Sequence, residues 1–69
     1  MIKKKDLIEN YHEDVVTWTT KNGLYYISTA RVPGAQYYPH VKVDGGWHRL
    51  EGFNTLEEAI DYLNNGVNI

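Results

Sequence analysis

The side chains that most often carry chemistry are few in this chain and widely spaced. Its 69 residues include no cysteine, which excludes disulfides, thiolate zinc sites, iron–sulfur clusters and cysteine nucleophiles. The three histidines, His12, His40 and His48, do not follow a zinc-binding spacing. We therefore expect no metal site and no cofactor.

Nucleophilic and acid–base catalysis have equally little support. Ser28 is the only serine, and it lies in the middle of an expected strand, without the sharp turn that exposes a hydrolase nucleophile. The adjacent acids Glu13-Asp14 and Glu57-Glu58 point in different directions on a helix, as solvated or capping groups do. Gly45-Gly46 precedes a strand rather than a helix, so it is a turn and not a phosphate cradle. We expect no catalytic residue, and a binding protein rather than an enzyme.

The last third of the chain has the clearest helical pattern. Apolar residues recur at positions i, i+3, i+4 and i+7, namely Leu56, Ala59, Ile60 and Leu63. Thr55 and Glu58 fit a capping box, and Asn64-Asn65-Gly66 suits the end of a helix. The sequence therefore predicts a helix over residues 55–64.

Before this helix, segments rich in β-branched and aromatic residues alternate with turn residues. The segments are 15–20, 24–32, 37–43 and 47–53, and the turns are Asn22-Gly23, Pro33-Gly34 and Asp44-Gly45-Gly46. Pro39 has no amide donor and so marks a sheet edge or a bulge. We expect a single α+β domain, residues 1–69, in which residues 15–53 form an antiparallel meander of three or four strands and the helix packs on one face.

Residues 1–14 allow two interpretations. Leu7, Ile8, Tyr11 and Val15 could line one face of a short helix that begins near Asp6. A frayed, charged arm is the alternative.

Side chains alternate across a strand, so the pairing of the hairpins divides residues between two faces. We pair Lys21 with Leu24, Val43 with Gly46, and Val32 with Tyr37. The face expected beneath the helix then carries Val15, Leu24, Tyr26, Ser28, Ala30, Val32, Val41, Val43 and Leu50. The other face carries Val16, Trp18, Tyr25, Ile27, Tyr38 and Trp47, interleaved with Arg31, His40, Lys42 and Arg49.

The second face is the expected binding surface, because monomers rarely expose so much aromatic area without a use for it. The net charge is −2, but seven of the nine acids lie in the two segments read as helical, and the basic residues of this face share it with Glu51 alone. The predicted binding residues are Trp18, Tyr25, Arg31, Tyr38, His40, Lys42, Trp47 and Arg49. Two alternatives remain open: residues 1–14 could fold over this face and make it core, or the register could slip at Pro39.

The segment Gly-Phe-Asn-Thr-Leu-Glu-Glu-Ala-Ile at 52–60, preceded by the strand 47–51, resembles the strand-to-helix junction of two DNA-binding folds. These are the arm-binding domains of tyrosine recombinases and the ethylene-response-factor domain of plants. The resemblance rests mainly on Phe53, Thr55, Glu57, Glu58 and Ala59. It implies three antiparallel strands against a carboxy-terminal helix, with DNA bound by the sheet through Arg31, Lys42 and Arg49.

Three kinds of partner fit the second face. A nucleic acid is slightly favoured, because aromatic rings can stack on bases while Arg and Lys hold phosphates. A protein is the alternative, which would make the chain an adaptor or inhibitor of the kind that phages or mobile elements encode. Homodimerisation through the same face is the third. No apolar run approaches the ~18 residues of a membrane helix, and we expect a cytoplasmic protein without a membrane partner.

Overall fold

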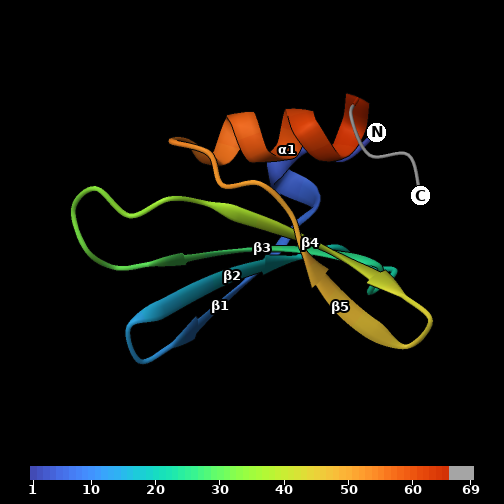
Figure 1. The fold of residues 1–69 in the computed structure, drawn as a ribbon, viewed down its shortest axis with the longest axis horizontal. Coiled ribbons are helices and arrows are strands. Elements are labelled where there is room, and N and C mark those ends of the chain that lie inside the picture. The colour runs from blue at the N-terminus through green and yellow to red at the C-terminus, as the bar shows by residue number, and fades with distance from the viewer. Residues whose placement is uncertain (66–69) are drawn as a thin grey trace.

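Five strands follow one another as a single antiparallel meander, and one helix comes after them, in the computed structural model, which describes residues 1–65 (Figure 1). The elements are β1 (Ile8–His12), β2 (Val15–Thr19), β3 (Tyr25–Ala30), β4 (Tyr38–Val43), β5 (Gly46–Arg49) and α1 (Leu56–Asn65). The expected α+β fold with a carboxy-terminal helix is confirmed. The sheet has five strands, whereas three or four were expected.

The additional strand comes from the amino-terminal segment. A 3-10 turn at Lys4–Asp6 is the only helical part, and β1 then pairs with β2 along its whole length, from Ile8 opposite Thr19 to His12 opposite Val15. The predicted short helix is therefore wrong. A single short helix is marginal in water, whereas pairing with β2 satisfies the backbone of this segment with ladder hydrogen bonds.

The predicted pairing within two hairpins is confirmed, although one turn differs. Val43 lies opposite Gly46, and Asp44 and Gly45 both have positive φ, as a two-residue hairpin loop requires. In the β2–β3 hairpin, Thr20 N–H donates to the Tyr25 carbonyl at 3.0 Å, so the loop covers residues 21–24 rather than Asn22-Gly23 alone. The pairing of β2 with β3 is unchanged by this difference.

The predicted pairing between β3 and β4 is wrong. We expected Tyr38 opposite Arg31, but Tyr38 lies opposite Ser28, three residues away. The turn at Pro33-Gly34 is present, with Ala35 N–H bonded to the Val32 carbonyl at 3.2 Å and Gly34 at φ +81°, but β3 already ends at Ala30. Because three is an odd number, the shift moves β4 and β5 to the opposite face relative to β2 and β3.

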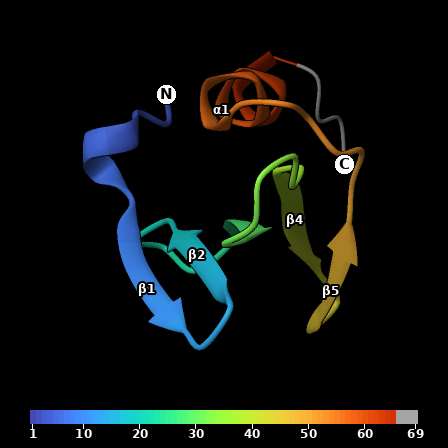
Figure 2. The same ribbon diagram turned by 90° about the vertical axis from the view of Figure 1, so that its left-hand side faces the viewer.

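The helix covers the face that carries Val16, Trp18 and Ile27 (Figure 2). The predicted stripe of α1, Leu56, Ala59, Ile60 and Leu63, is buried against it. This corrects the expected assignment for β2 and β3, whose Val15 and Tyr26 lie on the opposite face. Val41 and Leu50, from the β4–β5 half, do lie on the helix side as expected.

The ends of α1 agree with the capping pattern as far as the structure describes it. Glu58 N–H donates to Thr55 Oγ1 at 3.1 Å, and the Thr55 hydroxyl donates to Glu58 Oε1 at 3.1 Å. The expected terminator Gly66 lies outside the described residues. Within residues 1–65, no helix has the length and apolar character needed to cross a membrane.

The amino-terminal segment is held on the helix side of the sheet. Ile2 N–H donates to Asn64 Oδ1 at 2.8 Å, and Asn64 Nδ2 returns a bond to the Ile2 carbonyl at 2.8 Å. Ile2 and Leu7 pack against the core beneath α1. The alternative that residues 1–14 fold over the predicted second face and make it core therefore holds for the β2–β3 half, where Val16 and Trp18 are core. The β4–β5 half of that face stays uncovered.

Pro39 marks a bulge rather than an edge, because β4 lies between β3 and β5. Its carbonyl accepts the Leu50 N–H at 2.8 Å, but proline has no N–H to return the second bond. The next bridge joins Tyr37 to Phe53, which leaves Glu51 and Gly52 opposite the single residue Tyr38. The chain leaves β5 through this bulge and enters α1.

Candidate binding surface

The candidate site is the side of the sheet turned away from α1, which we call the far face. It consists of Ile8, Asn10 and His12 from β1, Val15, Thr17 and Thr19 from β2, Tyr26, Ser28 and Ala30 from β3, Tyr38, His40 and Lys42 from β4, and Trp47 and Arg49 from β5. The turns at residues 13–14 and 44–45 both project away from the helix (Figures 1 and 2). The far face therefore lies between two hairpins, one at each end of the molecule.

Aromatic rings gather on the part of the far face built by β3, β4 and β5. Tyr26 stacks on His40, with ring centroids 4.1 Å apart and planes 5° apart. The Trp47 ring meets the Tyr26 ring nearly perpendicularly, at 4.7 Å and 83°. Strand alternation explains the cluster, since Tyr26 lies directly opposite His40 and Trp47 directly opposite Lys42.

Two cations lie over rings of this cluster. Lys42 Nζ lies 5.8 Å from the Trp47 ring centroid, and the Arg49 guanidinium lies 5.0 Å from the Tyr38 ring centroid. None of the strand residues on the far face is acidic. Asp44 and Glu51 lie just beyond the two ends of β5. The surface is thus aromatic and basic, with acids only at its border.

His40 lies beneath this surface and is only 8% exposed. Its Nδ1 is buried and has no hydrogen-bond partner in the described structure. Burial has the largest effect and lowers the pKa of His40 from its ordinary value of 6.5. A backbone hydrogen bond with Tyr38 opposes it, the charge of Arg49 lowers the pKa further, and the Tyr26 backbone has the smallest, opposing effect. The imidazole is therefore held in its neutral form at neutral pH.

Gly52 allows the Tyr38 ring to lie where Arg49 reaches it. A Cβ at position 52 would come within 2.6 Å of Tyr38 Cε1 and 2.8 Å of Gln36 Oε1. The bulge therefore packs the backbone of Gly52 directly against the Tyr38 ring. Only glycine permits this contact, because it has no Cβ.

Five of the eight predicted binding residues lie together on the far face: Tyr38, His40, Lys42, Trp47 and Arg49. Trp18 and Tyr25 lie on the helix side, where Trp18 is buried and Tyr25 is half-buried. Arg31 follows the end of β3, and its guanidinium lies 4.4 Å from the Tyr11 ring centroid. The incorrect β3–β4 pairing accounts for the two aromatic residues that were wrongly grouped with this set.

Trp18 has a structural role in the described fold. Its indole Nε1–H donates to Glu9 Oε1 at 2.8 Å, and the Tyr11 hydroxyl donates to the other oxygen of the same carboxylate. These two bonds lower the pKa of Glu9 below 4.5. Glu9 thus fastens the edge strand β1 to β2 on the helix side.

Tyr26 is the member of the cluster that sequence reasoning placed on the wrong face. The pair Tyr25-Tyr26 offered a signal, because one of two successive strand residues must point to each face. Correct pairing of β3 with β4 was needed to show which tyrosine joins His40 and Trp47.

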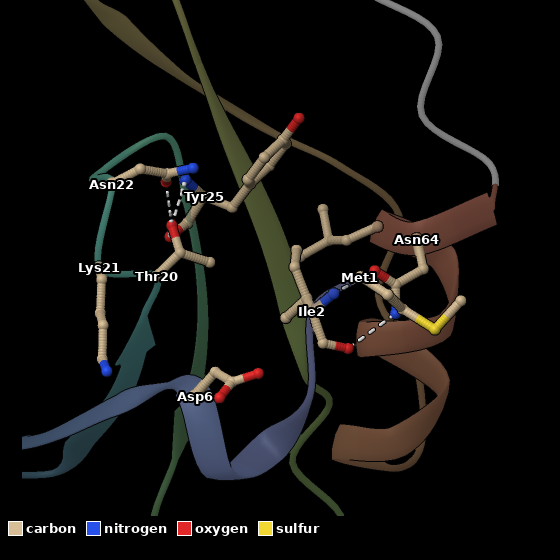
Figure 3. A pocket seen from close by; sticks show the side chains of 9 residues that line it. Met1, Ile2, Asp6, Thr20, Lys21, Asn22, Tyr25 and Asn64 are labelled. Atoms are coloured by element: carbon tan, nitrogen blue, oxygen red, sulfur yellow. Dashed lines mark hydrogen bonds between the residues drawn. The ribbon is translucent and has the colours of Figure 1, made fainter.

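A separate hollow of about 500 Å³ lies on the helix side, between the amino-terminal segment, the β2–β3 loop and the end of α1 (Figure 3). The paired bonds of Ile2 and Asn64 form one wall. The Thr20 hydroxyl, bonded to Asn22 Oδ1 at 2.7 Å, forms another. Of the predicted binding residues only Tyr25 lines this hollow, so it is distinct from the far face.

Residues 1–65 contain no group of three or more His, Asp or Glu side chains placed to hold a metal ion. In comparisons with protein-family models, with curated proteins and with solved structures, nothing matched this chain. The resemblance to recombinase arm-binding and ethylene-response-factor domains therefore stays a prediction.

Proposed function

We propose that this protein is a non-enzymatic binding module that docks a nucleic acid on its far face. One observation carries the proposal: rings and cations alternate on this face, and no strand residue on it is acidic. Rings that can stack and cations that can hold phosphates are the two components of a nucleic-acid groove.

The charge of the surface favours a polyanion over a neutral partner. Lys42 and Arg49 are both exposed, and each has an aromatic ring rather than a carboxylate as its neighbour. Neither has an acidic group within ion-pair distance in the described residues, so a phosphate would not have to displace one. Two cations support modest affinity. The logarithm of the binding constant should fall with the logarithm of the salt concentration with a slope of roughly −1.4 to −1.8.

A protein partner on the same face is the alternative, because Trp, Tyr and Arg are also the residues that anchor protein interfaces. The two proposals differ in their response to charge. Loss of a basic residue should nearly abolish a weak phosphate contact, whereas at a protein interface it mainly slows association.

The test is fluorescence anisotropy of a labelled oligonucleotide at low salt, with Lys42→Glu and Arg49→Glu as variants. Lys21→Glu is the matched control, since it makes the same charge change in the exposed β2–β3 loop, off the far face. We expect binding by the wild type and the control, and little or none by the two far-face variants. Equal loss in all three variants, or no wild-type binding at low salt, would contradict the proposal.

A further inference from the structure

We infer that the nucleic acid bound by the far face is single-stranded and that one of its bases stacks on the ring of Trp47, an inference that rests on the proposed function. Trp47 is the most exposed large aromatic side chain on the far face, at 43%. It stands on β5, next to both cations of the surface, Lys42 opposite it and Arg49 two residues on.

The indole is fixed in place before any ligand arrives. Tyr26 contacts it nearly perpendicularly, and Tyr26 is itself stacked on the buried His40. The three rings form a continuous packed unit across β3, β4 and β5. A ring held this way loses little conformational freedom on binding, which favours its use as a stacking platform.

The face of the indole is occupied by a group that a base can replace. Lys42 Nζ lies over that face at 5.8 Å, near the outer limit for a cation–π contact, so the contact is weak. Stacking of a base on an aromatic side chain is the stronger of the two interactions. The exchange is therefore favourable, and it frees the Lys42 ammonium to meet the phosphate of the same nucleotide.

A duplex would not use this surface in the same way. In a duplex the faces of the bases are already stacked on one another, and only base edges and phosphates are open to a protein. Edge reading in the major groove relies on Arg, Lys, Asn and Gln side chains, whereas the two cations here, Lys42 and Arg49, lie over the rings of Trp47 and Tyr38. Unstacked bases are the ligand whose chemistry matches an exposed, rigid ring.

The experiment compares a labelled single strand with a blunt hairpin duplex of the same sequence, by anisotropy at low salt. We expect the single strand to bind at least about 10-fold more tightly than the duplex. Trp47→Ala should weaken single-strand binding roughly 5- to 150-fold, which corresponds to one stacked base. Trp47→Phe should stay within a few-fold of the wild type, because it keeps an aromatic face.

Two controls separate this inference from the proposed function. Val32→Ala removes an exposed apolar side chain in the β3–β4 loop, outside the far face, and should leave binding unchanged. Circular dichroism of Trp47→Ala should show an intact fold. Equal affinity for the two ligands, or unchanged binding by Trp47→Ala while Lys42→Glu still abolishes it, would overturn the inference and leave the proposed function standing. Absence of binding to either ligand would overturn both.

Discussion

At the scale of single residues, His40 combines a buried imidazole with a position inside the proposed site. Its ring is stacked on Tyr26, its cross-strand neighbour is Arg49, and its Nδ1 has no partner in the described residues. Lys42 is on the same side of β4, so two permanent cations lie near a group that can become a third. Charging this imidazole is unfavourable in the folded protein.

We predict that stability falls as the pH is lowered through the titration of His40. Its pKa in the folded protein lies below the ordinary value of 6.5, so the unfolded chain binds more protons in this range. Stability is therefore highest above pH ~6.5 and is lost as the pH falls toward the lowered folded pKa. Urea unfolding of wild type and His40→Gln at several pH values measures this, and the variant should lack the dependence.

The Glu9 carboxylate titrates in a separate, more acidic range. The pKa of Glu9 in the folded protein is below 4.5. Its contribution to the stability of the fold is therefore present above pH 4.5 and is lost as the pH falls below that value. An unfolding profile in which His40→Gln keeps the full dependence between pH 7 and 5 would contradict the assignment to His40.

Gly52 offers a second test at this scale. A Cβ there would lie 2.6 Å from the Tyr38 ring, whereas a Cβ at Gly46 would meet nothing closer than the Val43 carbonyl at 3.8 Å. We predict that Gly52→Ala lowers the free energy of unfolding by about 1–3 kcal/mol, as overpacking does. Gly46→Ala should stay within about 0.5 kcal/mol of the wild type. Equal effects of the two substitutions in denaturant titrations would show that the bulge is not tightly packed.

At the scale of elements, the amino-terminal segment depends on one side chain of α1. Asn64 bonds both the N–H and the carbonyl of Ile2, and this pair holds the residues that lead into β1. We predict that Asn64→Ala lowers the free energy of unfolding by about 1–2 kcal/mol, because two hydrogen bonds are lost at a half-buried position. Amide hydrogen exchange should become faster in residues 2–7.

Asn65→Ala is the matched control, because Asn65 Nδ2 bonds only the Asp61 carbonyl of its own helix. This variant should leave exchange in the amino-terminal segment unchanged. If Asn64→Ala behaves like Asn65→Ala in both stability and hydrogen exchange, the hydrogen bonds between Asn64 and Ile2 do not hold this segment in place.

Elements that carry their own local signal could be predicted from the sequence. The stripe Leu56, Ala59, Ile60 and Leu63 specified both α1 and its buried side, and the Asp44-Gly45 turn specified the β4–β5 pairing. β1 was missed because its residues, Ile8 to His12, are all exposed at the sheet edge. The segment therefore shows no alternation of buried and exposed positions that would indicate a strand. An edge strand of this kind is defined by its partner rather than by its own pattern.

The β3–β4 pairing could not be predicted because the loop between these strands contains more than its turn. The sequence shows Pro33-Gly34, but nothing in it indicates that pairing ends at Ser28 and Tyr38. A three-residue error there placed Trp18 and Tyr25 beside Trp47. Within the β2–β3 half and within the β4–β5 half, the prediction divided the residues correctly into two sets. It joined the two halves the wrong way round, so the β2–β3 set assigned to the binding face lies beneath α1.

At the scale of the whole molecule, the two faces of the sheet differ in charge. α1 turns Glu57, Glu58 and Asp61 to solvent above the helix side, whereas the far face presents Lys42 and Arg49. A polyanion is therefore attracted to the far face and repelled by the exposed side of α1. Lys3, Lys4 and Lys5, exposed in the amino-terminal turn on the helix side, are the competing basic segment.

The two tryptophans report on these alternatives separately, because Trp47 lies on the far face and Trp18 lies buried beneath α1 with its indole N–H bonded to Glu9. The most direct measurement is a nitrogen–proton NMR titration of the labelled protein with a single-stranded oligonucleotide at low salt. We expect the indole resonance of Trp47 and the amides of Lys42 and Arg49 to shift, while the indole resonance of Trp18 stays in place. Shifts confined to residues 3–5 and Trp18, or no shifts at all, would contradict docking on the far face.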